Sequence, residues 1–89
     1  MWIYFFSGEN CKYCIEPKRQ LEDFKCDKAV VSFKDISDDL FSQFGLSKVP
    51  ALVIVETNGD IRKYQGAKKV SEEINRLKIT TKLNLTVEF

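Results

Sequence analysis

The stretch Trp2–Cys14, which reads WIYFFSGENCKYC, decides the fold. Its first five residues are apolar without alternation, which predicts a strand buried on both faces of a sheet. The next four, Ser-Gly-Glu-Asn, form a turn cluster. Apolar residues then recur from Cys14 to Phe24 with the period of one helical face, which predicts a helix over residues 12–24. A buried strand therefore turns directly into a helix, with Cys11 and Cys14 at the junction.

Further strands and helices are predicted downstream of this junction. They are a buried strand at 29–34, a short helix from the Ser37–Asp39 cap to Gly45, a strand at 51–56, an Asn58-Gly59 hairpin into a strand at 61–65, and a last helix capped by Ser71. The first two strands flank a helix and require a right-handed parallel crossover, whereas the hairpin adds antiparallel strands. We therefore expect an α/β fold of order βαβαββα with a mixed four-stranded sheet.

The C-terminal segment 79–89 stands outside this pattern. Residues 82–89 alternate polar and apolar side chains in strict period two. The apolar members, which would share one face of a strand, are Leu83, Leu85, Val87 and Phe89. This alternation predicts an extra edge strand that pairs with the sheet or with a second chain. The chain is accordingly divided into a domain over 1–78 and a C-terminal extension over 79–89.

Composition and charge exclude several classes of function. Fourteen Lys plus Arg against thirteen Asp plus Glu leave a net charge of +1, so we expect no nucleic-acid partner and no membrane partner. The absence of His removes Ser-His and Cys-His nucleophile pairs and His-containing zinc sites. Three cysteines are too few for a secreted disulfide framework, and the N-terminal apolar run is too short for a signal peptide. We expect a cytoplasmic protein without a cofactor.

The pair Cys11 and Cys14 carries the chemistry that remains. A C-x-x-C motif where a buried strand meets a helix is typical of a redox site. Unpaired amides and the helix dipole at a helix N-terminus stabilise a thiolate there. Cys11 is the better placed of the two, so it is expected to attack a substrate disulfide, and Cys14 is close enough to resolve the mixed disulfide.

Two other functions would also use a C-x-x-C motif. In a metal-binding module, Cys11 and Cys14 would be half of a thiolate site or of an iron-sulfur cluster that bridges two chains, with Cys26 as at most a third ligand. In a binding protein without turnover, a substrate groove or the expected edge strand would hold a partner. Cys26 itself is interpreted as a small, partly buried apolar residue rather than an exposed free thiol.

Over residues 1–78 the sequence resembles the thioredoxin and glutaredoxin family. The resemblance rests on a first strand that ends in Cys11-Lys-Tyr-Cys14 and on Val49-Pro50 at the start of the third strand, just before a hairpin. It implies a thioredoxin-like fold and a thiol-disulfide oxidoreductase with Cys11 and Cys14 as catalytic residues. It also implies a cis Val49-Pro50 bond against the cysteine pair, with Val49, Pro50 and Tyr13 in substrate binding.

The resemblance mixes features of two branches. The second half of the chain, with Asn58-Gly59-Asp60 after the third strand, looks like thioredoxin, whereas the short length is that of a glutaredoxin, as is a Tyr between the cysteines. The glutathione-binding pattern of glutaredoxins is poorly matched. The Trp and the buried Asp of thioredoxins are replaced by Asn10 and Phe5. The implied partners are disulfide-containing protein substrates and an external reductant, either a thioredoxin reductase-like enzyme or glutathione.

Overall fold

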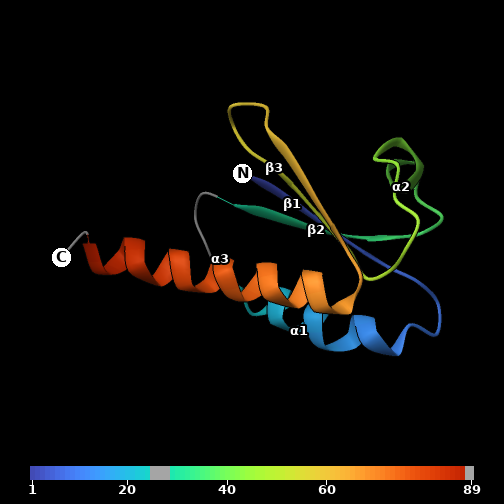
Figure 1. Ribbon diagram of the computed structural model, residues 1–89, viewed down its shortest axis with the longest axis horizontal. Coiled ribbons are helices and arrows are strands. Elements are labelled where there is room, and N and C mark those ends of the chain that lie inside the picture. The colour runs from blue at the N-terminus through green and yellow to red at the C-terminus, as the bar shows by residue number, and fades with distance from the viewer. Residues whose placement is uncertain (25–28, 88–89) are drawn as a thin grey trace.

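The computed structural model describes residues 1–24 and 29–87, with side chains as far as Lys78. A four-stranded sheet carries helices on both faces (Figure 1). In chain order the elements are β1 (Trp2–Ser7), the 3-10 turn η1 (Lys12–Cys14), α1 (Ile15–Glu22), β2 (Val30–Asp35), α2 (Asp39–Gln43), β3 (Ala51–Val55), β4 (Ile61–Gln65) and α3 (Ala67–Val87).

The strand order is β2-β1-β3-β4. Strand β1 runs parallel to β2 and antiparallel to β3, and β3 runs antiparallel to β4. The two central strands are the two apolar runs of the sequence, and a strand with neighbours on both sides and helices on both faces has no polar surface to present. The predicted α/β fold with a mixed four-stranded sheet is confirmed.

Two apolar clusters pack on the opposite faces of the sheet, because successive side chains of a strand point to opposite faces. On one face α1 and α3 lie side by side (Figure 1). The buried residues of this larger cluster are Ile3, Phe5, Cys14, Leu21, Leu52, Ile54, Val70, Ile74 and Leu77. The other face carries α2 and a smaller cluster of Phe6, Leu46, Ala51 and Val53. Each fully buried large side chain contributes roughly 1.5–3 kcal/mol, so the larger cluster dominates stability.

The turn between β4 and α3 differs from the sequence prediction. The last helix begins at Ala67, whereas Ser71 was expected to cap it. Gly66 adopts a positive φ of 96°, and its amide donates to the Pro50 carbonyl at 2.9 Å. The Val70 amide then donates to the Gly66 carbonyl at 3.0 Å, which closes the first helical turn before Ser71 is reached. The tight Gly66 turn therefore sets the helix start.

The C-terminal segment is helical, so the predicted edge strand is wrong for residues 82–87. Helix α3 continues without a break from Ala67 to Val87 and crosses the expected boundary at residue 79. No Gly or Pro interrupts this segment, so each residue can extend the hydrogen-bond ladder of the helix before it. Phe89 and Cys26 lie outside the described residues. Within the described part of the chain, no helix is both long and apolar enough to cross a membrane.

Candidate active site

The turn after β1 places both cysteines at the start of the first helix. The Cys11 amide donates to the Gly8 carbonyl at 3.3 Å, and the Cys14 amide donates to the Cys11 carbonyl at 3.2 Å. Asn10, which directly precedes Cys11, takes a left-handed φ of 61°, a conformation that Asn adopts more readily than most residues. This pair of tight turns winds the chain into η1 and then into α1.

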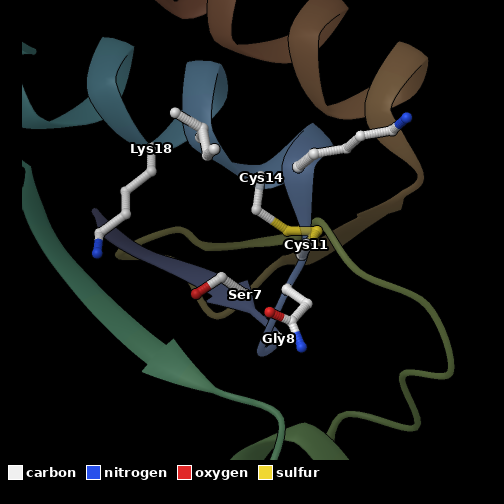
Figure 2. A pocket seen from close by; sticks show the side chains of 8 residues that line it. Ser7, Gly8, Cys11, Cys14 and Lys18 are labelled. Carbon is white, nitrogen blue, oxygen red and sulfur yellow. A yellow bond between two sulfur atoms is a disulfide. The ribbon is translucent and has the colours of Figure 1, made fainter.

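The two cysteines are joined by a disulfide in this structure (Figure 2). Their Cα atoms lie 5.4 Å apart, within the usual range for a disulfide. Cys11 is the N-cap of η1 and Cys14 the N-cap of α1, so both lie at the N-terminal end of the helical segment. Cys11 is half-buried, whereas the side chain of Cys14 is only 3% exposed. The spacing in the sequence therefore brings the sulfurs together but leaves them unequally accessible.

Cys14 lies in apolar surroundings. It belongs to the same buried cluster as Phe5 and Leu21, and the Phe5 ring packs edge-on against Phe33 with centroids 6.2 Å apart. Among the described residues, the buried charged side chain is Glu73 on α3, whose carboxylate is paired with Arg76. The Phe5 ring thus stands at the position that the resemblance compares with the buried Asp of thioredoxins, and the described members of the cluster around Cys14 include no carboxylate.

The Val49-Pro50 segment lies against the cysteine turn. Its peptide bond is cis, as the resemblance implies. Pro50 is fully buried, and Val49 packs against both apolar clusters. A Cβ atom at Gly8 would lie 3.3 Å from Val49 Cγ2, so the absence of a side chain at Gly8 allows this close approach. The carbonyl of Gly8 in turn accepts from the Cys11 amide. Gly8 thus links Val49 to Cys11, a role that sequence reasoning missed because it treated Gly8 only as a turn residue.

Tyr13, which the sequence assigned to substrate binding, points into solvent. Its side chain is 63% exposed, and the Lys12 ammonium lies 5.2 Å from its ring centroid. An exposed aromatic ring beside the disulfide is available to a docking partner and contributes little to the core. The role of Tyr13 in substrate binding stays a prediction.

A depression of about 430 Å³ opens beside the disulfide. Its lining combines the end of β1, the cysteine turn and the first turns of α1: Ser7, Gly8, Asn10, Cys11, Lys12, Cys14, Ile15 and Lys18. Figure 2 shows Lys18 and Ser7 on either side of the space next to the two sulfurs. Lys18 was also missed from the sequence, although its position four residues after Cys14 puts it on the same side of the helix.

The described residues contain no group of three or more His, Cys, Asp or Glu side chains that could hold a metal ion. Cys11 and Cys14 therefore meet as a pair, with peptide groups and apolar side chains around them. Two thiols that can close a disulfide between them can accept and release two electrons without a bound cofactor.

Solved structures of thioredoxins share this architecture. No family model and no curated protein sequence matches the chain. The germline-specific thioredoxin Deadhead of Drosophila melanogaster superposes with a TM-score of 0.71 at 20% identity, covering 86% of this chain and 77% of its own. Thioredoxin 1 of Thermosipho africanus gives 0.65 at 18% identity, covering 94% and 98%. A mutant thioredoxin from Halobacterium salinarum gives 0.70 at 20% identity, covering 90% and 74%. The chain therefore has the thioredoxin fold.

Proposed function

We propose that the protein is a thiol-disulfide oxidoreductase that reduces disulfides of protein substrates through the Cys11/Cys14 dithiol. The observation that carries this proposal is the unequal pair of bonded cysteines at the N-terminus of α1, with the cis Val49-Pro50 segment beside them. A structural disulfide has no need of one accessible sulfur, and a purely apolar pair of thiols would bury both.

The reaction starts from the reduced protein. Peptide amides at the helix N-terminus stabilise the Cys11 thiolate, which attacks one sulfur of the substrate disulfide. A mixed disulfide forms, and the other substrate sulfur leaves as a thiolate that takes a proton from water. The substrate backbone lies extended along Val49, in the manner of an added strand.

Cys14 completes the transfer. Its apolar surroundings disfavour a charged sulfur, so as it attacks the Cys11 sulfur of the mixed disulfide its proton passes, directly or through water, to the departing substrate sulfur. The second substrate sulfur departs as a thiol, and the Cys11–Cys14 disulfide seen in the structure is the oxidised product. Two electrons have passed to the substrate. An external thiol or dithiol returns them, supplied by a thioredoxin reductase-like enzyme or by glutathione in a reducing, cytoplasmic setting.

An insulin-reduction assay tests the proposal. The protein is supplied with electrons in three separate reactions: dithiothreitol, a thioredoxin reductase with NADPH, and glutathione with its reductase. We expect the wild type to accelerate insulin reduction with dithiothreitol, and one of the two enzyme systems to sustain turnover. The Cys11→Ser variant is the matched control and should not exceed the background. Equal rates with wild type and Cys11→Ser in all three reactions would overturn the proposal.

A further inference from the structure

Two lysines lie at the depression beside the disulfide. Lys12 stands between the two cysteines in the chain, and Lys18 follows Cys14 by about one helical turn. In Figure 2 the Lys18 side chain extends from α1 toward the end of β1 where Ser7 lies, and the disulfide lies across the space from Lys18. The depression thus has positive charge at its rim and a reactive sulfur pair at its edge.

The ammonium groups of Lys12 and Lys18 each have an aromatic ring as a neighbour. The Lys12 Nζ atom lies 5.2 Å from the centroid of the Tyr13 ring, and the Lys18 Nζ atom lies 5.8 Å from that of Phe33. Such contacts are weak at an exposed site and bias a flexible side chain without neutralising its charge. The rings therefore bias where the two side chains lie without removing them as binding groups.

The carboxylates near the cysteine turn lie outside the lining of the depression. Among the described residues, no Asp or Glu lines the depression, and the described ion pairs include neither Lys12 nor Lys18. Glu9 precedes the cysteines but is exposed in the turn. Asp35 pairs in register with Ser7, yet its carboxylate accepts from the Ser37 amide at 2.9 Å.

We infer that this depression selects disulfides flanked by acidic residues, with Lys18 binding the carboxylate of an Asp or Glu next to the attacked cysteine and Lys12 adding positive charge at the cysteine turn. The inference rests on the proposed function, because it specifies the substrate of the same site. A volume of about 430 Å³ accommodates such a side chain beside the sulfurs. The Ser7 hydroxyl and the Asn10 amide, which line the same space, can donate hydrogen bonds to it.

The size of the selectivity follows from the exposure of the lysines. An exposed ion pair changes affinity by up to about fivefold, so two lysines together give a preference of about three- to tenfold. The attraction is screened by salt, because the Debye length is about 10 Å at 0.1 M ionic strength. A preference of electrostatic origin must therefore decline as salt is added.

Three peptides measure the preference. Each contains one intramolecular disulfide, and they differ only in the residues that flank one cysteine: Asp, Ser or Lys. Pre-reduced protein is mixed with each peptide, quenched with acid and analysed by chromatography to obtain a second-order rate constant. Each constant is divided by that for uncharged dithiothreitol, which corrects for the effect of the flanking charges on thiol exchange itself. We expect the order Asp, Ser, Lys, with Asp about three- to tenfold ahead of Ser at low salt and nearly equal to it at about 0.5 M salt.

Variants assign the preference to the depression. Lys18→Gln should lower the Asp-to-Ser ratio by about two- to fivefold, and Lys18→Glu should invert the order of the Asp and Lys peptides. Lys69→Gln removes the same charge from a separate depression, next to Lys63 and Tyr64, and should keep the wild-type ratio.

The outcomes separate the inference from the function on which it rests. Reduction of all three peptides at equal corrected rates, or an Asp preference that survives in Lys18→Glu, overturns the inference and leaves the oxidoreductase proposal standing. A failure of the wild type to reduce any of the peptides faster than Cys11→Ser overturns the proposed function, and the substrate inference falls with it.

Discussion

The turn around Cys11 and the apolar cluster around Cys14 lie three residues apart in the chain and differ in how deeply they are buried. Cys11 is half-buried and packs against the apolar cluster from outside, whereas Cys14 is a buried member of that cluster and is 3% exposed. The difference arises because η1 advances the chain one turn into the protein between the two positions. In the proposed reaction, the more accessible sulfur of Cys11 is expected to meet the substrate first, and the buried Cys14 is expected to act second.

The largest expected effect comes from removing the accessible sulfur. Cys11→Ser should lower dithiol-dependent disulfide reduction by about 10³-fold or more, because the remaining thiol is buried. The rate of insulin reduction with dithiothreitol measures this loss. Cys26→Ser is the control and should retain wild-type activity, since the mechanism does not use that thiol. Substantial activity in Cys11→Ser would show that the two regions are not as different as their packing suggests.

A second test compares the buried face of α1, which packs in the cluster around Cys14, with the exposed face of the same helix. Leu21→Ala removes a side chain from the cluster that surrounds Cys14 and should lower the free energy of unfolding by about 2–5 kcal/mol. Ile15→Ala, on a residue that is 67% exposed, should change it by no more than about 0.5 kcal/mol. Urea unfolding of the oxidised variants measures both values. Similar losses in the two variants would contradict the assignment of buried and exposed faces.

The smallest expected effect is a pH dependence at Tyr64 on β4, which packs against the same apolar cluster as Cys14. Burial raises the pKa of Tyr64 above its ordinary value of 10.0, and the negative charge of Glu73 raises it further. As the pH rises past about 10, the unfolded chain loses this proton before the folded protein does, so stability falls through the folded pKa. Unfolding at about pH 8 and about pH 11 should show a larger loss for the wild type than for Tyr64→Phe. An equal loss in both would exclude Tyr64 as the cause.

Local patterns predicted the sheet and the position of the cysteine pair. The apolar runs of β1 and β3 and the Asn58-Gly59 turn each specify their structure within a few residues, because burial on both faces and tight turns require particular residue types. The C-x-x-C spacing likewise fixes the distance between the cysteines within one helical turn. These features depend little on the rest of the fold.

The features that the sequence did not predict depend on contacts between distant segments, or on whether a segment forms a helix or a strand. Val49 lies close to Gly8 although the two residues are far apart in the chain, and no local sequence pattern predicts this contact. The period-two alternation from residue 82 predicts a strand when it is considered alone. In the structure, the helix that begins at Ala67 continues through this segment to Val87. Continuing an existing helix avoids a new nucleation step, so the preceding residues override the local pattern.

Covalent trapping tests the order of attack most directly. The Cys14→Ser variant, fully reduced, is incubated with a peptide that carries one disulfide, and the product is identified by non-reducing peptide mapping and mass spectrometry. We expect a stable mixed disulfide on Cys11, because the resolving thiol is gone. No adduct should form on the Cys11→Ser variant under the same conditions. The absence of an adduct on Cys14→Ser, or an adduct carried by Cys26, would contradict the assignment of Cys11 as the attacking residue.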